Sequence, residues 1–531
     1  MKRRFALAIL ILLPLLVFGQ VLGNDFLALD DELLILDNVK VHAMTFANLK
    51  AIFTTYDPEL YIPVTLFTYM IEYSIFGANP VVFHATNLIL HLANALLVFV
   101  ILRKLLDERA AFLCALLFSV HPLQVEAVAW ASGRKDLLAG FFFLLSLYSY
   151  LGYRETGERY WLGFVFFVLG LGSKISVFPL PFVLIALDWM QNGSVTKKDW
   201  KEKIPFFLAS AIFLGIAFYG KAAQLVSPWV PITLSFAAVP LYLQHFFLPL
   251  GLSIFYPFVD EVSVMHPRIL TGVFVILGLA SAFFYGLRHN KRLMFGLLFF
   301  GLLLLPSLLN VVKGGEDGLY DFYLGSDRYM YLPMIGILFL VFLYFPKKLK
   351  IAVVPLVLVC SVLSFRYGTN WATSERLFAH AIAQESNSHI AYNNLAGMYA
   401  AGGRFDEAIP LYEQSIAIQK NSRALFNLAQ IYQHQRDYER AIARYEELLA
   451  FQPLHTAGHA RAGDLYLERG NTQMALLHTQ AALDQDQGSA LAHFTMGRLY
   501  EIAGKMDYAG LEYRAALALE PKNERFLQKK P

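Results

Sequence analysis

Long apolar segments recur through the first two thirds of this 531-residue chain, and they decide which folds are open to it. Each segment runs for about 17–22 residues, which at 1.5 Å per residue is enough to cross a hydrocarbon layer about 30 Å thick. Charged residues make up only 16% of the chain, against about 25% in soluble globular proteins. These features exclude a cytosolic enzyme and predict an all-α, polytopic helical membrane protein.

The apolar segments predict about 11 membrane-spanning helices. The first follows the basic start Met1–Arg4 and has no small-x-small cleavage site before Asn24, so we expect an uncleaved helix rather than a signal peptide. A further apolar stretch, Ile232–Leu250, contains two prolines, a glutamine and a histidine, which favours a re-entrant or interfacial segment. The expected spans are Phe5–Gly23, Val81–Leu102, Ala110–Trp130, Leu137–Leu151, Tyr160–Ser173, Val177–Met190, Pro205–Tyr219, Ile269–Leu287, Leu293–Leu309, Met330–Phe345 and Ile351–Phe365.

Basic clusters lie between alternate spans and indicate which helix ends share a side. Because Lys and Arg concentrate on the cytoplasmic side, a cytoplasmic N-terminus and an odd number of helices place the C-terminus outside. The compact loops and the Met-Lys-Arg-Arg start favour a bacterial inner membrane. The clusters are Lys2–Arg4, Arg103-Lys104 with Arg109, Arg154 with Arg159, Lys197–Lys203, Arg288–Arg292 and Lys347–Lys350.

After Asn370 the composition changes to Ala, Tyr, Gln, Glu and Arg, and residues recur every 34 positions. A register of this length is typical of tetratricopeptide repeats, whereas an ordinary helical bundle does not keep one. We expect four repeats over 389–522, a connecting helix at 368–388 that continues the last span, and a tail at 523–531. Stacked helix pairs form a concave surface that binds an extended peptide or protein. The register is kept by Tyr432, Tyr466 and Tyr500 on the first helices and by Ala441, Ala475 and Ala509 on the second.

The cysteines and the net charge exclude two further classes of protein. Cys114 and Cys360 both lie in apolar runs, so no disulfide framework or cysteine-based metal site is available. The formal net charge of +3 is too small to indicate nucleic-acid binding.

Polar and charged residues gather at the helix ends that this topology places outside. Charges at the boundary of a membrane are costly and are candidates for function, although each one alone could anchor a helix end or make a packing hydrogen bond. Asp260, Glu261, His266 and Arg268 lie in a fourth outer loop. The candidates are Asp30 and Asp31 in the first outer loop (24–80), His121, Glu126, Arg134, Asp136, Lys174 and Arg328.

These residue types suit the transfer of a group from a lipid phosphate to a hydroxyl. A carboxylate can act as general base, and we expect Asp30 or Asp31 in that role without separating the two. Lys174 and Arg328, with Arg134 third, would hold the phosphate, Arg as a planar fork and Lys as a point charge. We expect His121, Glu126 and Asp136 around the substrate. The acids could also coordinate a divalent cation, so metal dependence is left open.

Several short motifs together resemble those of the transmembrane and tetratricopeptide-repeat protein O-mannosyltransferases, a family of GT-C glycosyltransferases. The resemblance covers nearly the whole chain. It implies a GT-C-like catalytic domain at 1–367, a polyprenyl-phosphate sugar as donor, inversion at the sugar, a base in the first loop and a protein acceptor presented by the repeats. The motifs are Asp30-Asp31, Asn87–Asn94, His121–Asp136, Ser173-Lys174 and Asp327–Pro333. At two positions the sequence departs from the family's pattern: Ile62 stands where Arg is expected, and Ile175 stands where Glu follows Ser-Lys.

Two other classes of function compete with the glycosyltransferase. A non-enzymatic scaffold would use the membrane part as an anchor and the repeats to dock envelope proteins, but an anchor does not require so many helices. A transporter would place its charges in mid-helix along a pathway, whereas these lie mostly at helix ends. Convergence of Asp30, Asp31, Lys174 and Arg328 on one cavity would favour the enzyme.

The topology is tested with a reporter enzyme that is active only in the cytoplasm. Fused after Pro531, it is expected to stay inactive, because the basic clusters place the C-terminus outside. The same reporter fused after Asn290, within the cluster Arg288–Arg292, is expected to be active. Activity after Pro531 would contradict the odd number of spans and move the repeats to the other side of the membrane.

Overall fold

The computed structural model of this chain describes residues 3–57, 60–220, 227, 229–308, 310–314, 320–346 and 352–529. Two compact units are present; the first extends to Ser386 and the second begins at Asn387. Within the described residues, regular structure is helical apart from one antiparallel pair of short strands, β1 (Val312–Gly314) and β2 (Tyr320–Phe322). The predicted class, an apolar helical part followed by a repeat solenoid, is confirmed.

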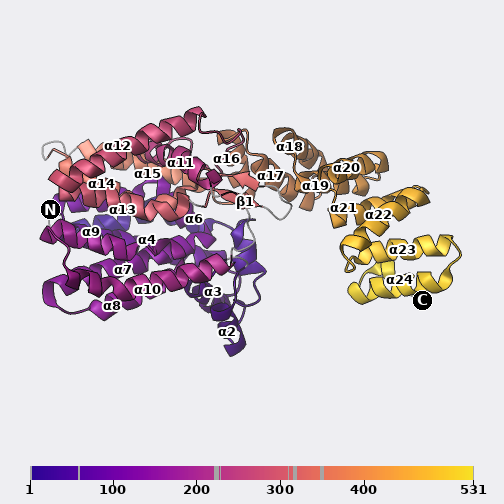
Figure 1. Cartoon of the computed structure of the whole chain (residues 1–531), viewed down its shortest axis with the longest axis horizontal. Helices are drawn as coiled ribbons and strands as arrows, with labels where there is room; N and C mark the ends of the chain where they lie inside the picture. The colour runs from indigo at the N-terminus through magenta and orange to yellow at the C-terminus, as the bar shows by residue number, and fades with distance from the viewer. Residues whose placement is uncertain are drawn as a thin grey trace. The chain divides into compact units, whose positions relative to one another are not determined.

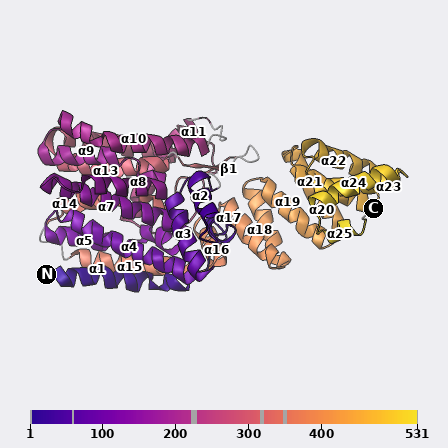
Figure 2. The same ribbon diagram turned by 90° about the horizontal axis from the view of Figure 1, so that it is seen from below.

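The helices of the first unit run side by side as a bundle (Figures 1 and 2). Two short helices, α2 (Phe46–Thr54) and α3 (Pro63–Phe76), lie at one end, which we call the site end. The first residues of α1 lie at the opposite end. The bundle contains α1 (Arg3–Phe18), α4 (Pro80–Leu102), α5 (Glu108–Val120), α6 (Val125–Ala129), α7 (Arg134–Thr156), α8 (Tyr160–Ser173), α9 (Leu180–Asn192), α10 (Lys197–Gly220), α12 (Pro267–His289), α13 (Lys291–Leu308), α14 (Met334–Tyr344) and α15 (Val353–Thr369).

Eight described helices are long and apolar enough to cross a membrane, and two bent pairs bring the number to 10. α8 and α14 are shorter apolar helices. The expected total of about 11 spans therefore stays a prediction. Among the sequence expectations, Lys2, Lys347–Lys350 and the span boundaries at Leu309 and Ile351 lie outside the described residues.

Two stretches that were expected to be continuous helix are bent. The span expected over Ala110–Trp130 bends by 54° at His121, because the residue before Pro122 takes an extended conformation. The expected connecting helix does not continue the last span: α16 (Ser374–Gln384) is bent by 119° from α15. Here Thr373 is extended, and its hydroxyl caps α16 by accepting the N–H of Arg376 at 3.3 Å.

The apolar stretch expected to be interfacial forms one helix, α11 (Trp229–Phe247), with Pro240 inside it. Near its start, the Ser235 hydroxyl donates to the carbonyl of Leu308, the last residue of α13, at 2.9 Å. Near its end, the carbonyl of Phe246 lies 3.0 Å from Nε2 of His121. These bonds tie α11 to the ends of α13 and α5, but by length and composition α11 is also one of the eight candidate spans, so its interfacial position stays a prediction.

Basic clusters that are far apart in the sequence meet at the opposite end of the bundle. Lys104, after α4, forms an ion pair with Glu155 of α7 at 2.5 Å. Lys291, at the start of α13, donates to the carbonyl of Gly193 after α9 at 3.0 Å. α7 and α9 both stop at a glycine with φ of +81°, which a glycine adopts without steric cost.

The second unit is a stack of four helix pairs (Figure 1). Between the two helices of each pair one residue has a positive φ, and these residues, Gly403, Arg436, Gly470 and Gly504, lie 33, 34 and 34 positions apart. The alanines that the register places on the second helices are buried between the helices of a pair. The pairs are α17 (His389–Ala401) with α18 (Phe405–Ile418), α19 (Ser422–His434) with α20 (Tyr438–Phe451), α21 (Thr456–Glu468) with α22 (Thr472–Gln485), and α23 (Ala490–Ile502) with α24 (Met506–Leu519), followed by α25 (Glu524–Leu527).

Candidate functional site

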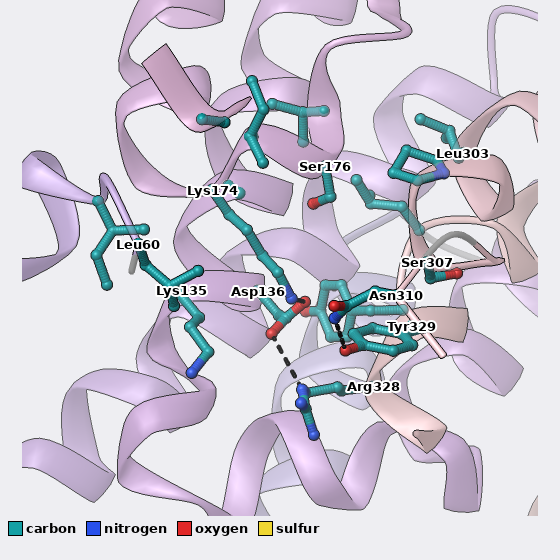
Figure 3. Close-up of a pocket in the computed structure, with 18 of the residues that line it drawn as sticks. Leu60, Lys135, Asp136, Lys174, Ser176, Leu303, Ser307, Asn310, Arg328 and Tyr329 are labelled. Atoms are coloured by element: carbon teal, nitrogen blue, oxygen red, sulfur yellow. Dashed lines mark hydrogen bonds and ion pairs between the residues drawn. The ribbon is translucent and has the colours of Figure 1, made fainter. Parts of the chain in front are cut away.

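A cavity of about 160 Å³ opens at the site end of the first unit (Figure 3). Part of its lining is apolar and comes from Ile62, Ile175, Phe213, Leu303 and Pro306, among others. The remainder is polar and comes from the start of α7, the turn after α8, the end of α13 and the segment before α14. A cavity with one apolar and one charged part suits an amphipathic ligand.

The charged residues of the lining are three cations, Lys135, Lys174 and Arg328, and one carboxylate, Asp136. Lys174 Nζ lies 2.5 Å from Oδ1 of Asp136, and Arg328 Nε lies 3.8 Å from Oδ2. In Figure 3 the side chains of Lys174 and Arg328 approach Asp136 from opposite sides. Within the lining itself cations outnumber carboxylates, although Lys135 and Arg328 are also paired with Asp30 and Glu126 behind it, so an anion would bind here by competing with these carboxylates.

Two aromatic rings hold these cations in place. The Trp130 ring lies beneath Lys135 and Arg328, at 4.9 and 5.0 Å from its centroid. The Tyr329 ring lies beneath Lys174 and Arg328, at 5.1 and 4.9 Å. Each such contact is worth about 0.5–2 kcal/mol. The rings keep the cations close together without neutralising their charge.

The two acids of the first loop have different surroundings. The carboxylate of Asp31 is buried and accepts the backbone N–H groups of Leu27 at 2.9 Å and Ser132 at 2.8 Å. Burial raises the pKa of Asp31 from 3.8 to about 6, so its ionisation weakens the fold as the pH rises through this range. The side chain of Asp30 is 42% exposed and lies 2.5 Å from Nζ of Lys135. Asp31 therefore ties the loop down, whereas Asp30 remains accessible beside the cavity.

Arg134 does not line the cavity. Its guanidinium is fully buried and makes two 3.0 Å hydrogen bonds to the carboxylate of Glu72. It also donates to the side chain of Asn87 at 2.5 Å and to the carbonyl of Phe83 at 2.8 Å. Arg134 thus joins α3, α4 and α7 and has no place among the phosphate-binding candidates.

Glu126 lies behind Arg328. Its buried carboxylate accepts the backbone N–H of Arg328 at 2.9 Å and forms an ion pair with the guanidinium. His121 uses both ring nitrogens locally, one near the carbonyl of Phe246 at 3.0 Å and the other accepting the N–H of Leu123 at 3.2 Å. Glu126 can orient Arg328, whereas His121 shapes the bend between α5 and α6.

The structure therefore separates the predicted site residues into three groups. Asp136, Lys174 and Arg328 line the cavity. Asp30 and Glu126 are each paired with a lining cation. The third group holds the backbone or the helices in place and consists of Asp31, His121 and Arg134. Asp260, in the fourth outer loop, faces His266 at 3.2 Å and is not part of the lining.

Lys135 is the lining cation that the sequence did not single out as a site residue. It stands between Arg134 and Asp136, and only the exact start of α7 decides which of these side chains faces the cavity. That start follows a 3-10 turn, η4 (Ala131–Gly133), in which a Cβ on Gly133 would lie 2.5 Å from the carbonyl oxygen of Ala127. Gly133 is the sequence signal that could have fixed the phase of the helix.

A divalent cation does not fit the donor groups at this site. Among the described residues no group of three or more His, Cys, Asp or Glu side chains is arranged to hold a metal ion. The carboxylates nearest the cavity, Asp30 and Asp136, each lie 2.5 Å from a lysine ammonium. Metal ions and ammonium groups compete for the same carboxylate oxygens, so these two lysines disfavour a metal ion at the site.

Both parts of the chain match models of known protein families. Residues 58–219 match the family described as dolichyl-phosphate-mannose-protein mannosyltransferase. Residues 387–454 and 426–490 match tetratricopeptide-repeat families. The chain thus combines a segment similar to a mannosyltransferase family with tetratricopeptide repeats, and the resemblance found in its motifs is confirmed.

Individual proteins that are similar to this chain are named as protein O-mannosyl-transferases. A protein O-mannosyl-transferase of Caenorhabditis elegans is 25% identical over 427 residues, which cover 73% of this chain and 59% of the relative. The mouse protein O-mannosyl-transferase TMTC3 is 34% identical over 131 residues, which cover 23% of this chain and 14% of the relative. The matched segments thus cover less than two thirds of the length of each of these relatives.

Solved structures also resemble part of the chain. YrrB, titled a TPR protein with an unusual peptide-binding site, is 18% identical and covers 30% of this chain, with 81% of its own length matched and a TM-score of 0.27. A MamA structure is also 18% identical and covers 29% of this chain, with 90% of its own length matched and a TM-score of 0.26.

Replacing Arg134 is expected to destabilise the fold rather than to weaken the binding of a substrate. Arg134→Ala leaves the buried carboxylate of Glu72 without its partner, which typically costs about 3–5 kcal/mol. Replacing both partners, Arg134→Met with Glu72→Met, should recover much of that loss. Thermal unfolding of the purified protein in detergent measures the effect. A single variant as stable as the parent, with weakened phosphate binding, would return Arg134 to the site.

Proposed function

We propose that this chain is a membrane glycosyltransferase that moves a mannose-like sugar from a polyprenyl-phosphate donor to a hydroxyl of a protein acceptor. The observation that carries the proposal is the cavity with three cations and an apolar wall. A polyprenyl-phosphate sugar has the same division, since an anionic phosphate is joined to a long apolar chain. The matches to mannosyltransferases add support from the sequence.

The phosphate would lie between Lys174 and Arg328. Both cations contact the Tyr329 ring and both approach Asp136, so their charges converge on one small volume. Arg328 can offer two parallel N–H donors to phosphate oxygens, and Lys174 adds a point charge. Asp136 keeps the two cations together in the absence of donor and yields them to the phosphate when it binds.

The proposed reaction is a single displacement at the anomeric carbon. An acceptor hydroxyl attacks from the face opposite the phosphate, the bond from carbon to phosphate oxygen breaks, and polyprenyl phosphate leaves. One displacement inverts the anomeric configuration. The leaving phosphate is weakly basic, so cations can stabilise it without a separate acid. The hydroxyl proton must pass to a base during the attack, which typically contributes 10²–10⁴-fold to the rate.

Asp30 is the better candidate for this base. Its carboxylate is partly exposed and is held at the rim of the cavity by Lys135. Both oxygens of Asp31 already accept backbone N–H groups in a buried loop, where no acceptor hydroxyl can reach them. Asp31 then acts by fixing the segment that carries Asp30. Asp136, which lines the cavity, is the next candidate.

The repeats would bind the protein acceptor. Their helix pairs belong to the tetratricopeptide class, whose stacked helices present a concave surface to extended peptides. We place the site end and the repeats on the extracytoplasmic side of a bacterial inner membrane, from the distribution of basic clusters. A non-enzymatic scaffold remains the alternative, and it requires acceptor binding without sugar transfer.

Donor affinity tests the phosphate site. Lys174→Gln and Arg328→Gln are each expected to weaken binding of a polyprenyl-phosphate sugar by about 1.5–3 kcal/mol, the value of a hydrogen bond to a charged group. Lys40→Gln is the matched control, because Lys40 forms an ion pair with Asp57 in the first loop and does not line the cavity. Titration of the purified protein with labelled donor gives the affinities. Unchanged affinity in both site variants would make these residues helix anchors.

Sugar transfer tests the enzyme and its base together. The purified full chain is incubated with a panel of polyprenyl-phosphate sugars and a Ser/Thr peptide, and glycopeptide is measured. We expect transfer by the parent and a loss of about 10²-fold or more in Asp30→Asn, since Asn is nearly isosteric but cannot take the proton. Donor binding should be retained in this variant, whereas some loss of stability is expected because Lys135 loses its ion-pair partner.

Two outcomes of this assay would count against the assignment. Transfer by Asp30→Asn at the parent rate would move the base to Asp136. Binding of acceptor protein with no transfer of any sugar would favour the scaffold. Asp31→Asn has a different expected signature: its amide would face a backbone N–H, so the protein should lose stability as well as rate.

A further inference from the structure

A sharp elbow joins the last long helix of the bundle to α16. It consists of residues 370–373 between α15 and α16, where the direction of the chain changes by 119°. The Trp371 side chain is fully buried, and Ser374 at the start of α16 is buried as well. In the sequence, α16 ends at Gln384 and the first repeat helix begins at His389. The elbow and α16 are therefore the stretch of chain that leads from the bundle into the repeats.

The elbow is hydrogen-bonded to the loop that carries Asp30. The carbonyl of Ala372 accepts the N–H of Asp25 at 3.0 Å. The Ser374 hydroxyl oxygen accepts the N–H of Ala28 at 2.8 Å. Asp30 follows two residues later. Ser374, the first residue of α16, thus accepts a backbone N–H of this loop although the two residues are 346 positions apart in the sequence.

The same elbow also contacts the supports of the cavity cations. The Trp371 ring lies against Trp130, with centroids 6.4 Å apart, and Trp130 lies beneath Lys135 and Arg328. Just before the elbow, the Tyr367 hydroxyl lies 3.4 Å from the carboxylate of Asp327, the residue next to Arg328. The elbow thus contacts both the loop of Asp30 and Trp130, the ring beneath Lys135 and Arg328, which we call the cation platform.

We infer that Ser374 is a positioning residue for sugar transfer: it fixes the loop of Asp30 relative to the cavity, and Trp371 beside it fixes the cation platform. The inference rests on the proposed function. It adds that the geometry of the site depends on the stretch of chain leading into the acceptor-binding repeats. Ser374 touches no reacting atom and acts through the backbone of the loop.

An ordinary structural role for Ser374 makes a different prediction. A serine at the start of a helix often bonds the N–H groups of its own helix, and losing that bond lowers stability only. Here Thr373 provides that cap, and Ser374 bonds Ala28 of the loop. Removing the hydroxyl should therefore loosen the loop while the helix keeps its cap.

The test compares Ser374→Ala with two matched variants in the full-length protein. Ser374→Thr keeps the acceptor oxygen. Ser361→Ala removes another buried hydroxyl, which among the described residues donates within α15, to the carbonyl of Val357 at 2.8 Å. Hydrogen exchange of peptides covering Asp25–Asp31 reports the loop without any need for activity. Steady-state transfer and donor titration report the reaction.

We expect faster exchange of this loop in Ser374→Ala than in the parent, Ser374→Thr and Ser361→Ala. We also expect kcat to fall by about 3–10-fold, the effect of one neutral hydrogen bond, with donor affinity unchanged. Loop exchange equal to the parent, or faster exchange with full kcat, would overturn the inference. If the parent itself transfers no sugar, the proposed function fails, and the exchange result still decides whether Ser374 holds the loop.

Discussion

The cations of the cavity persist in partly apolar surroundings because each faces a carboxylate and an aromatic ring. Removing an ion from water costs several kcal/mol unless an opposite charge and good hydrogen bonds offset the loss. Lys135 lies beside Asp30, Lys174 beside Asp136, and Arg328 beside Glu126. These pairs can form only if the first loop, α6, the start of α7, the turn after α8 and the segment before α14 all meet at the site end. The architecture of the first unit satisfies that requirement.

The sequence predicted those features of the fold that belong to single segments. The length of the apolar segments and the 34-residue register are such features. They predicted the helical class and the repeats. Bends depended on local chemistry, such as the extended residue before Pro122. The site residue types were also predicted, but their roles were not, because neighbours such as Asp30 and Asp31 differ in burial. What separates them is a contact with Ser132, 101 positions away, which no local pattern reports.

The two positions at which the sequence departs from the pattern of the O-mannosyltransferase family both lie in the cavity lining. Ile62 and Ile175 stand where Arg and Glu are expected, and both side chains line the cavity. The two replaced charges are opposite, so the balance of charge in the lining is unaffected while its apolar area grows. Burial of apolar surface contributes about 25 cal/mol per Å². This part of the wall therefore offers contact with hydrocarbon or with the apolar face of a sugar, rather than a further ion pair.

The ion pairs of the site also impose an order on biogenesis. Asp30 and Lys135 are 105 residues apart, and Glu126 and Arg328 are 202 apart. During synthesis the carboxylate of Glu126 enters the forming bundle long before its guanidinium partner leaves the ribosome. Completion of the cavity consequently waits until Arg328 has been synthesised, and a chain truncated before Arg328 would leave Glu126 without this ion-pair partner.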